Sequence, residues 1–254
     1  MSGASNSWVE VGEGVFARRY QPWDVTVGVV IGDAGLLVID TRASAEEGDE
    51  LRHDLRHLDP RPPRWIVNTH DHFDHLAGNV SLLPAAVWSH PSLEPAPDHA
   101  VEGAVTADLG DRAVVLRHLG RGHTAGDVVA TVAGAGVTFA GDLVEESGPP
   151  AYGEDSFPLE WPATNARLLG LVRDGDRIVP GHGAPVGRAF VAAQQRALDL
   201  AARTIRHLWV GEVPVDEALA EGADRWPFPP EALRTAVRLG YRHLNVSAGR
   251  DSDG

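Results

Sequence analysis

Four candidate metal ligands, His70, His72, Asp74 and His75, lie within six residues in the segment Thr69-His70-Asp71-His72-Phe73-Asp74-His75. The segment follows a short buried-strand pattern at Trp65–Asn68 and precedes a helical pattern. Because side chains two apart on an extended chain share a face, His70 and His72 can bind one cation together. Asp74 and His75, at the turn into the helix, can face a second cation. The run predicts metal chemistry at the carboxyl end of a strand.

Three further candidates stand beside glycine at the ends of strand patterns, where the backbone must turn sharply. They are His123 in Gly122-His123-Thr124, Asp142 in Gly141-Asp142, and His182 in Pro180-Gly181-His182-Gly183. With the first run they give five histidines and two aspartates, enough ligands for two divalent cations. The chain has no cysteine, so thiolate ligands are excluded. Imidazole with carboxylate suits zinc first, with iron and manganese as alternatives.

The ordered pattern H-x-H-x-D-H, G-H-T, G-D and P-G-H-G resembles the metallo-β-lactamase superfamily across residues 10–186. This resemblance implies an α/β fold, the four-layer αβ/βα sandwich, with the metals at one edge between two sheets. It also implies two groups of ligands that share one bridging aspartate, Asp142. The first cation would be held by His70, His72 and His123, and the second by Asp74, His75 and His182.

Several other residues are candidates for supporting roles. By the same resemblance, Asp40 at the end of the strand pattern 37–39 would orient a ligand histidine. Thr69 could support its loop by a hydrogen bond, or stand there for its strand propensity alone. Tyr152, on the loop after Asp142, and His90, after a strand, could contact a substrate. The alternatives are a weakly constrained position for Tyr152 and a capped loop residue for His90.

The expected activity is hydrolysis by two cations that share a water. Two cations about 3.5–4 Å apart lower the pKa of that water towards about 7, so a metal-bound hydroxide can attack a carbonyl. Asp74 is the candidate catalytic residue, because it can orient the hydroxide and pass a proton to the leaving atom. A non-catalytic, metal-bound binding module is the alternative from another class, and loss of one ligand would be its sign. All seven ligand positions are filled.

The substrate class is narrowed by residues that differ among branches of the family. The bridging Asp142 and the helical C-terminal pattern resemble glyoxalase II and the lactonases, although Asp127 stands where glyoxalase II often has a second histidine. The chain lacks the cysteine and the lysine that true β-lactamases often use. Its net charge of −14 disfavours a nucleic-acid substrate. We therefore expect a small-molecule ester, thioester or lactone first, a phosphodiester second and a β-lactam third.

The elements that must position these residues alternate between strand and helix patterns. Among them, a capping pattern predicts a helix over 44–58, and the sequence favours further helices over 76–83, 161–173, 186–210, 215–223 and 230–244. We expect a catalytic domain over 8–186 and a helical extension over 187–246 packed on it, with disordered ends at 1–7 and 247–254. No apolar run approaches the roughly 20 residues that cross a bilayer. The short, polar, uncharged start favours a cytoplasmic protein, and the extension would allow a homodimer.

Overall fold

Thirteen strands pair into one continuous sheet in the computed structural model, which describes residues 7–249. In chain order the strands are β1 (Val9–Gly12), β2 (Val15–Tyr20), β3 (Val25–Gly32), β4 (Gly35–Ile39), β5 (Pro63–Val67), β6 (Ala86–Ser89), β7 (His99–Ala100), β8 (Ala104–Asp108), β9 (Ala113–His118), β10 (Val128–Val132), β11 (Val137–Glu145), β12 (Arg177–His182) and β13 (Val186–Gly187). Within that range, β3 and β12 pair at one position, His182 with Val25. This narrow seam divides the sheet into a half with β1–β7 and a half with β8–β13.

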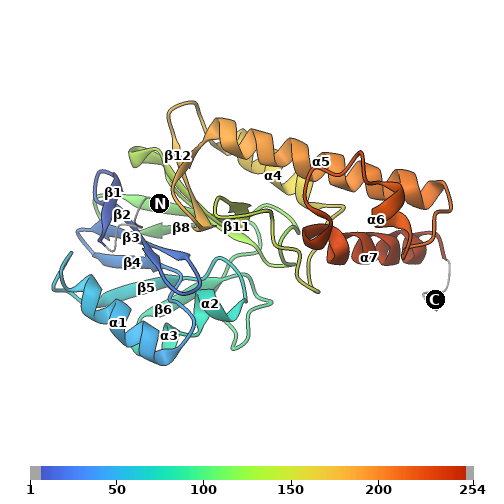
Figure 1. Ribbon diagram of the computed structural model, residues 1–254. Coiled ribbons are helices and arrows are strands. Elements are labelled where there is room, and N and C mark those ends of the chain that lie inside the picture. Colours follow the sequence, from blue (N-terminus) through green and yellow to red (C-terminus); the bar gives the residue numbers. More distant parts are fainter. Residues whose placement is uncertain (1–6, 250–254) are drawn as a thin grey trace.

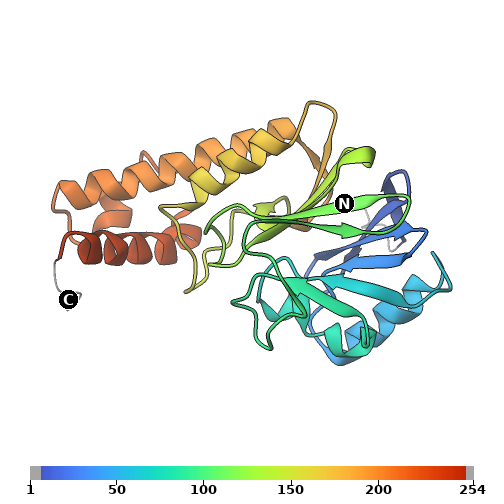
Figure 2. The same cartoon turned by 180° about the vertical axis from the view of Figure 1, so that it is seen from behind.

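Helices cover the outer face of each half, as Figures 1 and 2 show. The first half carries α1 (Ala45–Leu55), α2 (Phe73–Leu76) and α3 (Asn79–Leu82). The second half carries α4 (Trp161–Leu171) and the start of the long helix α5 (Arg188–Val210). Beyond the sheet, α6 (Ala218–Glu221) and α7 (Pro230–Ser247) pack against α5. A single 3-10 turn, η1 (Ala133–Ala135), joins β10 to β11.

Three hydrophobic clusters fill the three interfaces between these layers. Because successive strand residues face opposite sides, Leu37 and Ile39 of β4 join the cluster between the two sheet halves, while Leu36 and Val38 pack towards α1. On the other half, Phe139 of β11 points into the central cluster. A third cluster lies between that half and the helices α4, α5 and α7. The four-layer αβ/βα arrangement expected from the sequence is thereby confirmed.

The prediction of one helix over 76–83 is wrong in detail, because the structure has two one-turn helices, α2 and α3, on either side of Gly78. Gly78 N donates to Arg42 O at 3.1 Å, and a Cβ at this position would lie 1.9 Å from Thr41 O. The chain is therefore held against the segment after β4, and that contact interrupts the helix. The capping prediction for α1 agrees with the structure, since Glu47 N donates to Ser44 Oγ at 3.2 Å.

The remaining differences lie at the ends and in short elements. The helix expected over 215–223 is reduced to the four residues of α6. The end segments 1–6 and 250–254 lie outside the described residues, whereas Ser247 is the last residue of α7. Within residues 7–249, none of the helices combines the length and the apolar character needed to cross a membrane.

Candidate metal centre

The ends of β4 and β5 are locked together by a buried carboxylate. Asp40, directly after β4, has a left-handed backbone (φ 62°) and is 1% exposed. Its two oxygens accept hydrogen bonds from Thr69 N (2.8 Å), Thr69 Oγ1 (2.9 Å) and His75 Nδ1 (2.8 Å). Because His75 donates through Nδ1, its Nε2 is free to bind a cation. Asp40 thus contacts both Thr69 and the candidate ligand His75.

The first ligand group brings together His70, His72, His123 and Asp142. His72 Nδ1 and His123 Nε2 are 2.9 Å apart, and His123 Nε2 is 3.4 Å from Asp142 Oδ2. His70 Nε2 lies 3.8 Å from the same oxygen. All these groups except His72 are buried. Four ring and carboxylate atoms therefore converge on one point.

The second ligand group contains Asp74, His75 and His182. His182 Nε2 lies 3.3 Å from Asp74 Oδ2, 3.3 Å from His75 Nε2 and 3.4 Å from Asp142 Oδ2. His75 Nε2 lies 3.3 Å from the other oxygen of Asp142. Asp142 therefore stands between the two groups. A Cβ at position 181 would lie 1.8 Å from Asp142 Oδ1, so Gly181 makes room for this carboxylate.

These distances fit divalent cations. For metal–ligand bonds of 2.0–2.1 Å, two ligands on one tetrahedral ion are about 3.3–3.4 Å apart, close to most of the separations above. His70 Nε2 and Asp142 Oδ1 are also buried without a hydrogen-bond partner. A buried polar atom without a partner is costly, and a cation would remove that cost. The residues present therefore fit the metal centre that the sequence predicts.

The electrostatics of the cluster favour a cation at the same place. Burial would raise the pKa of Asp142, but the neighbouring histidines hold it well below its ordinary value. Burial and the charge of His75 lower the pKa of His70 well below its usual range. For His75, burial lowers the pKa, but the carboxylates of Asp142 and Asp40 outweigh it and raise the pKa to about 9. The ionised carboxylate of Asp142 and the imidazoles therefore lie close together in a site that is shielded from water.

The loop over 150–157 fastens the first ligand group from outside. His123 Nδ1 donates to Ala151 O (2.9 Å), and Ser156 Oγ donates to His123 O (2.7 Å). Asp155 Oδ2 lies 3.1 Å from His72 Nε2, the nitrogen that faces away from His123. The sequence reasoning missed Asp155, because an acid in a Gly/Pro-rich loop carries no spacing signal.

A second missed residue, Glu145, stands at the end of β11. It is 6% exposed and forms a further potential ligand group with Asp142 and His182. Burial and the charge of Asp142 raise the pKa of Glu145 well above its ordinary value. Its position three residues after Asp142 was the available signal, but an unbroken strand would place these two side chains on opposite faces.

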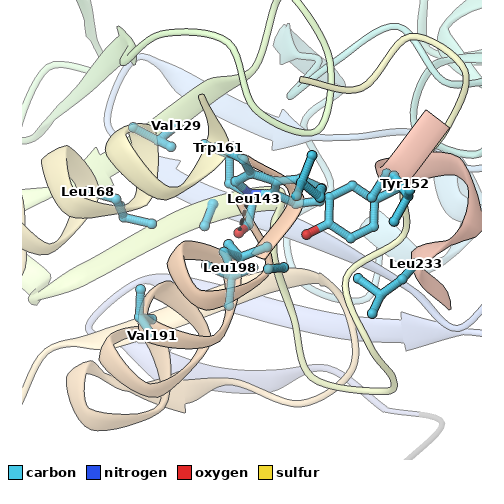
Figure 3. Close-up of a cluster of buried hydrophobic side chains, with 14 of the residues drawn as sticks. Val129, Leu143, Tyr152, Trp161, Leu168, Val191, Leu198 and Leu233 are labelled. Carbon is cyan, nitrogen blue, oxygen red and sulfur yellow. Dashed lines mark hydrogen bonds between the residues drawn. The ribbon is translucent and has the colours of Figure 1, made fainter. Parts of the chain in front are cut away.

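Tyr152 and His90, the two residues expected to contact a substrate, both lie outside the ligand groups. Tyr152 is buried against Trp161, with ring centroids 5.2 Å apart, and its hydroxyl points into the hydrophobic cluster without a hydrogen-bond partner (Figure 3). Burial raises the pKa of this phenol. Its neighbours there include Leu143 and Leu233.

His90 bonds to Ser92 Oγ (2.8 Å) and packs on His118, outside the ligand groups found among the described residues. The hypothesis of a substrate contact is therefore wrong for Tyr152, and His90 is a loop residue with local partners.

Comparison with known families and proteins supports the family resemblance noted in the sequence. The model of a family described as the metallo-beta-lactamase superfamily matches residues 20–182. The chain is 28% identical over 186 residues to the alpha subunit of 2,4-dinitroanisole O-demethylase from Nocardioides sp. (strain JS1661), covering 65% of this chain and 56% of that subunit. It therefore spans little more than half of that relative. It is 23% identical over 192 residues to a type 2 metallo-beta-lactamase from Bacillus sp. (strain 170), covering 70% of this chain and 73% of that protein.

Solved structures share the fold. A metallo-beta-lactamase from Pontibacter korlensis superimposes with a TM-score of 0.66 at 22% identity, over 76% of this chain and 98% of that one. The metallo-beta-lactamase FIM-1 from Pseudomonas aeruginosa, in its mono-zinc form, also gives 0.66, at 19% identity, over 77% and 96% of the two chains. At this identity the likeness concerns the fold alone.

Proposed function

The chain belongs to the metallo-β-lactamase superfamily, and from that premise we propose that it is a metal-dependent hydrolase that uses two cations to cleave an ester, thioester or lactone. The observation that carries the proposal is the pair of ligand groups with Asp142 between them. The many imidazoles favour zinc. The bridging aspartate in place of a cysteine supports a glyoxalase II-like or lactonase-like branch.

The chain's own residues would bind and orient the reactants. When bound, the two cations supply a water of lowered pKa and polarise the carbonyl under attack. Asp74 would hold this water and accept its proton. Burial would raise the pKa of Asp74, but the hydrogen bond from His182 outweighs it and keeps the carboxyl ionised at neutral pH. Asp40 and Thr69 keep the ligand loop in place.

Two exposed aromatic side chains beside the centre favour a substrate with an apolar or aromatic group. Trp23 and Phe73 are 48% and 52% exposed and meet edge to face, with ring centroids 5.0 Å apart. The carbonyl of Trp23 accepts from the ligand His182 at 2.8 Å, and Phe73 stands between two ligand residues in sequence. The name of one relative, a dinitroanisole O-demethylase subunit, likewise points to an aromatic substrate for that protein.

The charges around the centre favour a neutral substrate. Three arginines contact the segments that carry or hold the candidate ligands, and each is paired with an acid: Arg19 with Asp24 (2.9 Å), Arg121 with Glu160 (3.0 Å), and Arg238 with Glu154. A guanidinium that already holds a carboxylate has less capacity for a second anion. This pairing supports an aryl or lactone ester ahead of a phosphodiester or a β-lactam, both of which carry a negative charge.

The test combines metal content with a panel of substrates. Purified protein would be analysed by mass spectrometry for metals, then assayed with p-nitrophenyl acetate, a homoserine lactone, S-lactoylglutathione, 2,4-dinitroanisole, nitrocefin and bis-p-nitrophenyl phosphate. We expect about two cations per chain and turnover of a neutral ester. Replacement of Asp74 by Asn should lower turnover by about 100-fold or more, since proton handling alone contributes about 10²–10⁴-fold.

Asp71→Asn is the matched control, because Asp71 lies in the same loop and is exposed. It should retain the activity of the unmodified protein. Fewer than one cation per chain under metal-replete conditions would refute the two-cation proposal. Turnover of nitrocefin alone would overturn the preference for neutral esters.

A further inference from the structure

The carboxylate of Glu145 belongs to the cluster by position, although the expected ligand set does not use it. One ligand atom from each of Asp142, Glu145 and His182 lies within 4.8 Å of the others. All three side chains are largely withdrawn from water, with Glu145 at 6% and Asp142 at 5% exposure. Asp142 Oδ1 also has no hydrogen-bond partner.

An irregularity in β11 brings the two acids together. Between the pairs Gly141↔Pro180 and Glu145↔His182, β11 advances by four residues while β12 advances by two. The register already shifts between Phe139 and Gly141, so the extra residues form an irregular stretch that includes Gly141, whose φ of 54° suits glycine. Because this irregular stretch breaks the alternation of side chains, residues 142 and 145 can face the same point. The backbone is fixed there, since Glu145 N donates to Gln194 Oε1 at 3.0 Å.

Two carboxylates this close and this buried repel each other unless a proton or a metal cation lies between them. His182 has only one nitrogen for such a cation, because its Nδ1 donates to Trp23 O at 2.8 Å. Its Nε2 faces Asp74, His75 and Asp142. The cation near Glu145 is therefore the one that His182 shares with Asp74 and His75, and not a third ion.

We propose that Glu145 is a ligand of the second cation, and that it makes the two metal positions chemically different. This inference rests on the proposed two-cation function. The first position then has three imidazoles and the shared Asp142, whereas the second has two imidazoles and three carboxylates. Oxygen-rich sites suit Mn²⁺, and imidazole-rich sites suit Zn²⁺. The second position should therefore accept Mn²⁺ while the first retains Zn²⁺.

Metal binding, measured apart from activity, tests the proposal. Metal-free protein, Glu145→Gln and the control Glu221→Gln, at an exposed position on α6, would be titrated with Mn²⁺ and with Zn²⁺. Free Mn²⁺ would be followed by electron paramagnetic resonance, and bound metal by mass spectrometry after dialysis. We expect one tight Mn²⁺ per chain in the unmodified protein and the control, and affinity lower by at least about 10-fold in Glu145→Gln, the scale of lesser losses around metal sites. The Zn²⁺ at the first position should be unaffected.

A second readout guards against a folding defect. In the metal-free state Glu145→Gln keeps the size of the side chain and can still donate a hydrogen bond to Asp142, so its melting temperature should stay close to that of the unmodified protein. The rise in melting temperature on adding Mn²⁺ should then shrink. If Glu145→Gln does not fold, Glu145→Asp keeps the charge but retracts the carboxylate, and should show the same loss of Mn²⁺. Mn²⁺ binding equal to that of the unmodified protein in a folded variant would overturn the proposal. Failure of the unmodified protein to bind two cations would instead refute the two-cation function.

Discussion

Each of the five candidate ligand histidines has its second ring nitrogen held by a separate partner. The partners are Thr69 Oγ1 for His70, Asp155 for His72, Asp40 for His75, Ala151 O for His123 and Trp23 O for His182. Such partners fix the tautomer and the direction of each ring. Two of the five are carboxylates, which also make the imidazole a stronger ligand. The geometry of the centre is thus distributed over four loops.

Asp155 is the more exposed of the two carboxylates, and its removal should weaken the first metal position. In Asp155→Asn the charged acceptor of His72 is lost, so we expect Zn²⁺ affinity to fall by about 10-fold, the low end for such partners. The side chain of Asp155 is 49% exposed, and water can replace part of the lost hydrogen bond. Competition with a chromophoric chelator would measure the change.

The neighbouring Glu154→Gln is the control for Asp155, because Glu154 is more exposed and pairs with Arg238 on α7. It should leave Zn²⁺ affinity within about two-fold of the unmodified protein, as exposed ion pairs contribute little. Equal Zn²⁺ affinities in Asp155→Asn and Glu154→Gln would show that His72 is oriented without Asp155.

The sequence predicts some of these residues and not others for a physical reason. His70, His72, Asp74 and His75 are close along the chain, so their convergence follows from local geometry. Glu145 and Asp155 reach the centre through an irregular stretch of strand and a loop, and the pattern of residue types specifies neither. Tyr152 shows the opposite error, since its place on the site loop suggested exposure and its ring is buried (Figure 3).

At the scale of elements, Gly78 connects the ligand loop to the strand that supports it. Its backbone fits between Thr41 O and Gly48, where a Cβ would be 1.9 Å from the Thr41 oxygen. This approach allows Thr41 N to donate to His75 O at 2.8 Å, directly beside the contact of Asp40 with His75. The break between α2 and α3 is therefore part of the support for the metal centre.

Gly78→Ala should destabilise the fold, because backbone on both sides must move to admit the methyl group. We expect a loss of about 1–3 kcal/mol or more in the free energy of unfolding, as for other overpacked positions. Gly170→Ala is the control, since Gly170 lies within α4 with nothing within 4 Å of an added Cβ. That change should stabilise by up to about 1 kcal/mol through helix propensity. Urea denaturation would compare the two, and equal stabilities would contradict the packing argument.

Helix and strand prediction succeeded where periodicity is long and failed where contacts decide. The helices α4, α5 and α7 follow from their apolar spacing, and α1 also from its capping residue Ser44. The break at Gly78 depends on a contact with Thr41, which is distant in sequence, so the local apolar spacing does not predict it. The edge strand β8 was missed because its alternation is weak, with only Ala107 fully buried.

At the scale of the molecule, α4 and the C-terminal helix α5 are both joined to the end of β11 that carries Asp142. The carbonyl of Leu143 accepts hydrogen bonds from Trp161 Nε1 (3.3 Å), Asn165 Nδ2 (2.9 Å) and Gln194 Nε2 (2.8 Å). The first two donors lie on α4 and the third on α5. Around them, one hydrophobic cluster combines residues of β11, α4, α5 and α7. We therefore propose that the expected extension over 187–246 unfolds together with the catalytic domain.

Leu198→Ala tests whether the extension and the domain form one cooperative unit. Leu198 on α5 is fully buried in the shared cluster, so its truncation should cost about 2–5 kcal/mol of unfolding free energy. Val210→Ala, at the end of the same helix and 72% exposed, should cost almost nothing. In a thermal melt, the loss of helical signal and the release of bound Zn²⁺ should coincide at one lowered temperature for Leu198→Ala. If the helical signal fell first while Zn²⁺ stayed bound, the helices would be a separate unit, because metal retention requires the end of β11 to remain in place.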